Sequence, residues 1–519
     1  MRPNVSVVER LSVTGLAAAL ALLAGIGAIE IFLGGPRVIL VIGGLFAFAI
    51  TLVLSGNPRL YCLWGLVLTA PMRVKLSFAV IPHMGGAAAY TLDLVDLFLV
   101  PLALFLLRDF ATGYRRNLRL SGFSFWWGCL IVLGLLSVAA GPFRQVPLQE
   151  VVRMAKLLLL FVVFINEVVR VRQFKHVFAA LMVGVALQCF VALAQYLFDI
   201  NLGAQILGEA LPTEAEFTSR ATYLEDEFTY RVGALFGHPN LLSIYLAMML
   251  PIGIAMMFTG MDYVLKGLVG VLMLVGVGVL IITLSRSGWI SFAIAFIALL
   301  FLSFLHPRVR TRFLLARVGL VSLIAVVSLA LSGLIIKRIV QSDSGAVEFR
   351  IEWMKLAWRM IEDKPIFGIG LNSFVFRMAP YSDYGTVEGL TDKFGPEQYL
   401  PVVHNIYLLV WSEQGTIGFL FFLGLNGYLY LTAWRNAKHF YDEALYMINL
   451  GCLAGLMALS TDGMVSFFIR IDACGRVFVL VAGLIVAIHY WQDENAPIRA
   501  RAPPRPEQRR IGGPAPSRP

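Results

Sequence analysis

Charged residues are scarce in this chain. Asp, Glu, Lys and Arg make up 14% of its 519 residues, whereas 59% of the residues are apolar. A soluble domain usually has about 25% charged residues, and the composition therefore excludes a soluble protein. The apolar runs are about 20 residues long, the length that a helix needs to cross a bilayer, and lack the shorter alternating pattern of membrane barrels. We therefore expect an all-α polytopic protein in a lipid bilayer.

Residues typical of metal and redox sites are also few. The chain has five cysteines and seven histidines, and no cysteines have the Cys-x-x-Cys spacing of a zinc or redox motif. It contains no Asp-x-Asp, His-Glu-x-x-His or Walker-type sequence. The net charge of +10 would raise nucleic acid as a partner of a soluble protein, but in a membrane protein basic residues set the orientation. We expect no metal, no cofactor and no nucleic-acid partner.

Apolar windows along the chain predict about 12–14 transmembrane helices. The windows lie near residues 11–33, 38–55, 59–71, 92–107, 123–140, 150–168, 176–198, 239–258, 264–284, 288–305, 318–336, 404–431, 443–462 and 474–491.

Basic residues gather in alternate loops, at 108–121, 169–175 and 306–317. The positive-inside rule places these loops and both chain termini in the cytoplasm. Segment 337–403 then lies outside, and within it residues 346–362 have an amphipathic helical pattern. We expect one long folded outer loop, with this helix lying on the membrane. Its apolar stripe is Val347, Ile351, Met354, Trp358 and Ile361.

Four polar residues on the predicted outer face point to chemistry. His404 directly follows the long loop, and an imidazole can act as a base near neutral pH. Arg231, Arg286 and Arg350 fall on the same face, and guanidinium groups match phosphate oxygens in a bidentate way. Structural roles are the alternative: a capping or interface residue for His404, and an interfacial residue with its charge in water for Arg286. The gathering of all four on one face favours a site.

Six short strings occur in order between residues 230 and 420. They resemble the O-antigen ligase and Wzy-type O-antigen or exopolysaccharide polymerase family of bacterial envelope glycan assembly. The strings are Arg231-x-Gly-x-x-x-Gly-His238-Pro-Asn240, Ser285-Arg286-Ser287-Gly288, Arg350-x-x-x-Met-x-x-Ala-Trp358, Asp363-Lys-Pro-Ile-Phe-Gly-Ile-Gly370, His404-Asn405-Ile-Tyr407 and Glu413-Gln-Gly415-x-x-Gly418.

The resemblance implies an inverting, metal-independent glycosyltransferase of the GT-C type. It would act at the periplasmic face of the bacterial inner membrane on an undecaprenyl-diphosphate-linked oligosaccharide donor. By resemblance, Arg231 and Arg286 bind the diphosphate, His404 accepts the proton of the acceptor hydroxyl, and Arg350 is the loop arginine of the family. The remaining motif residues are expected to bind substrate, namely His238, Asn240 and Asn405.

The acceptor distinguishes two enzymes within this family. A polymerase passes the glycan to another lipid-linked repeat unit, and a ligase passes it to lipid A-core. We expect a polymerase, with the ligase as the alternative, and a chain-length regulator and a flippase as further partners. A transporter of polysaccharide or lipid-linked substrate is the rival from another class. It predicts charged residues at span centres and an internal repeat, whereas the candidate charges lie at span ends and no repeat is evident.

These inferences divide the chain into five regions. They are N-terminal transmembrane helices at 1–230, transmembrane helices of the ligase- or polymerase-like core at 231–336, a periplasmic loop at 337–403, C-terminal transmembrane helices at 404–491, and a disordered, basic, Pro-rich cytoplasmic tail at 492–519.

Overall fold

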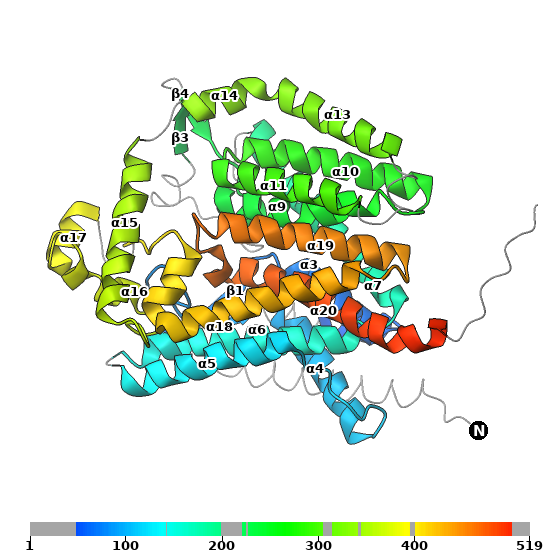
Figure 1. The fold of residues 1–519 in the computed structure, drawn as a ribbon, viewed down its shortest axis with the longest axis horizontal. Coiled ribbons are helices and arrows are strands. Elements are labelled where there is room, and N and C mark those ends of the chain that lie inside the picture. Colours follow the sequence, from blue (N-terminus) through cyan, green and yellow to red (C-terminus); the bar gives the residue numbers. More distant parts are fainter. Residues whose placement is uncertain are drawn as a thin grey trace, which may run out of the picture.

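The computed structural model describes residues 48–141, 143–198, 221–224, 227–304, 314–340, 344–394 and 400–500. Most of these residues form helices that lie side by side in one bundle (Figure 1). The prediction of an all-α polytopic membrane protein is confirmed, since the described strands are only two short hairpins. The predicted span 11–33 and most of 38–55 lie outside the described residues.

The first half of the bundle contains helices α3 to α7. A β-hairpin precedes α4, and its antiparallel strands pair Lys75 with Asp93 and Phe78 with Tyr90. The elements are α3 (Pro58–Thr69), β1 (Lys75–Phe78), β2 (Tyr90–Asp93), α4 (Asp96–Ala111), α5 (Gly122–Ala140), α6 (Gln145–Glu167) and α7 (Val171–Phe198).

The second half starts with another hairpin and contains the longest helices. Its first elements are β3 (Ala221–Leu224), β4 (Glu227–Tyr230), η2 (Ala234–Phe236), α9 (Pro239–Met256), α10 (Tyr263–Ile282), α11 (Arg286–Leu302), α13 (Leu314–Ala330) and α14 (Ser332–Val340). The remainder are α15 (Ser344–Asp363), α16 (Phe374–Arg377), η3 (Ala379–Tyr381), α17 (Val387–Phe394), α18 (Ile406–Ala437), α19 (Glu443–Asp462), η5 (Phe468–Arg470) and α20 (Asp472–Ala500).

Seven helices in the described part of the chain are long and apolar enough to cross a membrane: α5, α7, α9, α10, α18, α19 and α20. Helix α11 is apolar but shorter. Helix α6 covers the predicted span 150–168 but carries three charged residues in its first half, Glu150, Arg153 and Lys156. The protein is therefore a multi-pass membrane protein. Helix α6 differs from the seven candidate spans in the charged residues of its first half.

The centre of the bundle is the contact between α9 and α19. Helix α9 is buried along nearly its whole length, and α11 packs against both α9 and α19. Two glycines of α19 bring the backbones together: a Cβ at Gly451 would lie 2.6 Å from Cα of Ile252, and one at Gly455 would lie 2.6 Å from the carbonyl oxygen of Met248. Small residues four apart permit such close packing in membrane helices.

Helix α15 lies across one end of the bundle, roughly perpendicular to the helices that it covers (Figure 1). The predicted helix at 346–362 is thus confirmed, but among the described side chains of its predicted stripe only Ile361 is buried in the face that packs against the protein. Ile351 and Trp358 of that stripe are exposed. The packed face is formed by Trp353, Leu356, Ala357, Met360 and Ile361, because α18 supplies the apolar partner surface for α15.

Three further expectations need correction. The window 318–336 contains two helices, α13 and α14, which are separated at Leu331, and α14 crosses the boundary expected at 336. The first part of the expected disordered tail, residues 492–500, is the end of α20. Residues 501–519 lie outside the described residues.

Candidate active site

His404 lies in the segment that leads from the outer loop into α18. Its Nδ1 is 3.0 Å from the carbonyl oxygen of Val402. Since a carbonyl can only accept a hydrogen bond, Nδ1 carries the proton and Nε2 keeps its lone pair. The ring of Phe467 meets the imidazole edge to face, with 5.2 Å between the ring centroids and an angle of 84°. The imidazole is thus held by one hydrogen bond and one aromatic contact.

The surroundings of His404 favour its neutral form. Burial, together with the positive charge of Arg350, lowers the pKa of its imidazole to about 4, while the bond to Val402 opposes the shift. The pKa lies below neutral pH, so the ring is uncharged there. A neutral imidazole with a lone pair on Nε2 can accept a proton.

Arg350 lies on the second turn of α15, and its guanidinium interacts electrostatically with Arg286, His404 and Asp462. Burial lowers the pKa of its guanidinium, and the neighbouring positive charge of Arg286 contributes, whereas the negative charge of Asp462 opposes the change. His404 and Arg286 come from elements far apart in the sequence, yet both interact electrostatically with Arg350. The structure therefore brings His404, Arg286 and Arg350 together at the end of the bundle that α15 covers.

Arg286 is the first residue of α11 and is half-buried. The start of this helix is fixed by close packing, because a Cβ at Gly288 would lie 2.6 Å from Cβ of Ser243 on α9. No side chain caps the helix, and the first backbone N–H groups of a helix have no acceptor within it. Arg286 therefore adds a positive charge to the positive end of the dipole of α11, and both attract anions.

Arg231 supports the turn that carries Arg286. Its Nε donates to the carbonyl oxygen of Thr283 at 3.0 Å, and its Nη2 donates to Oδ1 of Asn240 at 2.7 Å. Thr283 ends α10, and Leu284 beside it has a positive φ of 54°. Arg231 is buried and therefore holds the connection between α10 and α11 in a conformation that an L-residue rarely adopts.

The other two predicted residues lie at helix starts. Nδ1 of His238 accepts a hydrogen bond from the backbone N–H of Asn240 and so caps α9. Asn405 caps α18 by accepting from the backbone N–H of Leu408, and its amide donates to the carbonyl oxygen of Met464. The capping role that was the alternative for His404 belongs instead to its neighbour Asn405, which is the N-cap of α18.

Two residues that the sequence did not single out complete the site. Asp462 ends α19, where the hydroxyl of Ser466 donates a short hydrogen bond to its carboxylate and Ser287 lies beside it. Phe467 follows in the connection to η5. In the sequence Asp462 reads as an ordinary helix end before Gly463, and nothing local connects it with Arg350. One signal in the sequence could have drawn attention to the segment that carries Asp462 and Phe467. Arg470 lies there between two apolar runs, as Arg286 does in its own segment.

A broad depression of about 460 Å³ lies between α15 and the start of α18. None of His404, Arg286 and Arg350 is among the residues that line it. The aromatic ring of Trp358 and two basic side chains line it together with aliphatic residues. The lining residues are Ile351, Met354, Lys355, Trp358, Arg359 and Leu408.

Residues 269–423 match the model of the O-antigen ligase family. The chain carries an O-antigen ligase domain. The resemblance seen in the sequence motifs is thereby confirmed over these residues, and the match to a family of glycosyl-transferring ligases and polymerases supports an enzyme. No curated protein shows a significant sequence match to the chain.

The O-antigen ligase domain contains part of the candidate site. Arg286, Arg350 and His404 lie within the matched residues, whereas Arg231 and Asp462 lie outside them. Among the described residues, no cluster of three or more His, Cys, Asp or Glu side chains is placed to hold a metal ion. Metal-independent chemistry stays a prediction.

Proposed function

We propose that this O-antigen ligase family protein transfers a glycan from undecaprenyl diphosphate to a sugar hydroxyl at the periplasmic face of the membrane. The observation that carries the proposal is the imidazole of His404, oriented by Val402 and Phe467 and close to Arg350, which in turn lies close to Arg286. Glycosyl transfer from a diphosphate requires both a base for the acceptor and positive charge for the leaving group.

His404 is the proposed base. The acceptor hydroxyl oxygen attacks the anomeric carbon, and the bond from that carbon to the diphosphate oxygen breaks with its electron pair on the diphosphate. The hydroxyl proton passes to Nε2 of His404, which keeps its lone pair because Nδ1 faces Val402. Attack from the side opposite the leaving group inverts the anomeric configuration.

Arg286 and the start of α11 are the proposed binding site for the diphosphate. A guanidinium fork and free helix N–H groups both suit phosphate oxygens. Arg350 adds a second positive charge from α15. Arg231, with Asn240, keeps the turn before α11 in place and so acts on the diphosphate through Arg286. In this scheme arginines stabilise the leaving group in the way that a divalent cation does elsewhere, so the reaction needs no metal.

The acceptor is proposed to be a second lipid-linked repeat unit, which makes the enzyme a polymerase of O-antigen or exopolysaccharide. The depression between α15 and α18 is proposed to hold sugars of the acceptor, since Trp358 offers a ring face and Lys355 a hydrogen-bond donor. The family description favours the ligase as the second candidate, with lipid A-core as acceptor. A flippase that supplies the donor and a chain-length regulator are proposed as partners of the polymerase.

The test uses purified protein in nanodiscs and an undecaprenyl-diphosphate-linked repeat unit. A polymerase makes a ladder of products on a gel from this substrate alone, whereas a ligase makes product only when lipid A-core is added. The variant His404→Ala is expected to lose product. His439→Ala, which changes an exposed histidine in the connection between α18 and α19, is the control and is expected to keep it. Inactivity of wild-type protein with both acceptors refutes glycosyl transfer and favours transport.

A further inference from the structure

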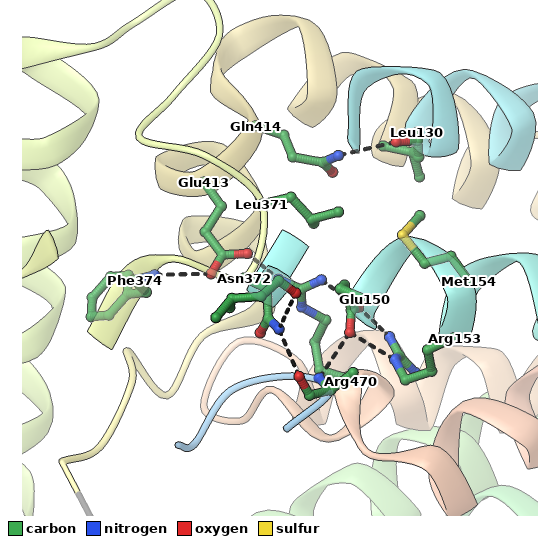
Figure 2. Close-up of polar contacts among 12 residues, drawn as sticks. Leu130, Glu150, Arg153, Met154, Leu371, Asn372, Phe374, Glu413, Gln414 and Arg470 are labelled. Atoms are coloured by element: carbon green, nitrogen blue, oxygen red, sulfur yellow. Dashed lines mark hydrogen bonds and ion pairs between the residues drawn. The ribbon is translucent and has the colours of Figure 1, made fainter. Parts of the chain in front are cut away.

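A buried cluster of charges lies outside the proposed reaction centre. Glu150 of α6 is 0% exposed and accepts hydrogen bonds from three groups. Arg153 donates to it through Nε at 2.9 Å and Nη2 at 2.5 Å. Nη1 of Arg470 donates at 2.6 Å, and the backbone N–H of Ala87 donates at 2.9 Å. The second carboxylate of the cluster, Glu413 on α18, pairs with the other terminal nitrogen of Arg470 (Figure 2).

The charges of this cluster balance, with two carboxylates and two guanidinium groups. Removing a charge from water is costly unless a partner replaces the water. Replacing such pairs by apolar residues is often neutral or stabilising, and a buried ion cluster is therefore weak evidence for a stabilising role. It does impose specific positions on the chain segments that carry it, because each group must meet its partners. Four segments meet here: α6, the loop between β1 and β2, α18 and η5.

The first connection to His404 runs through Arg470. Arg470 ends η5 and is held by Glu150 and Glu413 from two sides. Three residues before it, the buried ring of Phe467 packs against the imidazole of His404. Glu150 therefore fixes, through Arg470, the short segment that carries Phe467, whose ring contacts the imidazole of His404.

The second connection runs through the loop between β1 and β2. Ala87 donates its N–H to Glu150, and its carbonyl accepts from the side-chain amide of Asn372 at 2.9 Å. Two residues earlier, Gly85 lies against Val402, where an added Cβ would be 2.3 Å from Cγ1 of Val402. The carbonyl of Val402 is the group that accepts from Nδ1 of His404. The two groups that orient the imidazole, the ring of Phe467 and the carbonyl of Val402, are thus both connected to Glu150 through intermediate residues.

We propose that Glu150 is a positioning residue, which fixes the orientation of His404 through Arg470 and Phe467 on one side and through Ala87 and Val402 on the other. The inference rests on the proposed function, in which His404 is the base. It assigns a role to residues outside the O-antigen ligase domain, since Glu150, Ala87 and Arg470 all lie beyond residues 269–423. Glu150 touches no reacting atom in this proposal.

The test compares kinetic constants of the full chain in nanodiscs. Glu150→Gln keeps the size of the side chain but removes the charge that holds Arg470. Phe467→Leu keeps an apolar side chain but removes the ring. A displacement of about 1 Å can cost about 100-fold in rate, so kcat is expected to fall about 10- to 100-fold in both variants. The KM for the lipid-linked donor is expected to stay within about twofold, because the donor site is unchanged.

Asp109→Asn is the matched control. Asp109 is also a buried carboxylate, with 2% exposure and an ion pair of 2.6 Å to Arg59, but it has no connection to His404. Its kcat per folded protein is expected to be that of the wild type. Equal kcat values for Glu150→Gln, Phe467→Leu and Asp109→Asn would overturn the positioning role. If Glu150→Gln does not insert, Glu150→Asp takes its place, because it keeps the charge but draws the carboxylate back from Arg470 and Ala87.

A second measurement separates failure of this inference from failure of the proposed function. Diethyl pyrocarbonate modifies neutral imidazoles, and mass spectrometry gives the rate at the peptide that contains His404. We expect faster modification in Glu150→Gln and Phe467→Leu than in Asp109→Asn, because the imidazole is no longer held. Wild-type protein that makes no glycan product refutes the proposed function alone. Equal modification rates in all three variants refute the positioning role.

Discussion

Gly415 is the residue at which one substitution should disturb both the fold and the site. It interrupts α18 with φ of 64° and ψ of −171°, a region of backbone conformation open essentially to glycine only. The loop after α15 lies directly on it: a Cβ at this position would be 2.2 Å from the carbonyl oxygen of Ile366. The N–H of Thr416 donates to the carbonyl oxygen of Pro365 at 2.7 Å, so the loop cannot move away without losing that bond.

The expected effect of Gly415→Ala follows from two terms. The backbone conformation costs about 1–3 kcal/mol for a residue with a Cβ, and the crowding of Ile366 costs about 1–3 kcal/mol more. The free energy of unfolding should therefore fall by about 2–6 kcal/mol. Gly427→Ala on the same helix is the control, because no atom lies within 4 Å of its added Cβ. Alanine there should stabilise the helix by about 0.5–1 kcal/mol.

Thermal unfolding in nanodiscs, followed by intrinsic tryptophan fluorescence, compares the two variants under the same conditions. Gly415→Ala should melt well below wild type and lose glycan transfer at temperatures where Gly427→Ala is folded and active. A melting temperature of Gly415→Ala equal to that of Gly427→Ala would show that the kink is not required, and the argument from backbone conformation would be refuted.

Three other predictions concern the site and its orientation. Arg286→Lys should lose most of the glycan transfer measured in nanodiscs although the charge is kept, because a point charge does not reproduce the guanidinium fork; wild-type turnover would contradict a diphosphate site. The base is active when neutral, so kcat/KM should stay level below pH 6.5, the ordinary pKa of histidine, and fall only near pH 4, the pKa of His404; a fall centred at the ordinary value would contradict the buried base. A cysteine replacing Asp383 in the outer loop should react with an impermeant thiol reagent added to spheroplasts, and one replacing Thr112 should react only after permeabilisation; the opposite result would invert the topology.

Only part of the candidate site could be predicted from the sequence. His404, Arg286 and Arg350 stand in short motifs, and the structure places them together. The bond from Asn405 to Met464 and the bond from Arg231 to Thr283 depend on backbone carbonyls that lie 59 and 52 residues away in the chain. Asp462 carries no local signal, because an acid at a helix end before a glycine is common and its proximity to Arg350 is a long-range contact.

The sequence by itself determined the class of an all-α polytopic membrane protein, because an apolar run of sufficient length has no other stable form in lipid. It also determined the family, because the motif residues keep their order and spacing along the chain. Only the tertiary structure decided which face of α15 is packed, where α18 kinks and how Glu150 meets Arg470, 320 residues away in the chain. Those features depend on contacts between segments distant in sequence, and hydropathy along one segment contains no information about the partner that will cover it.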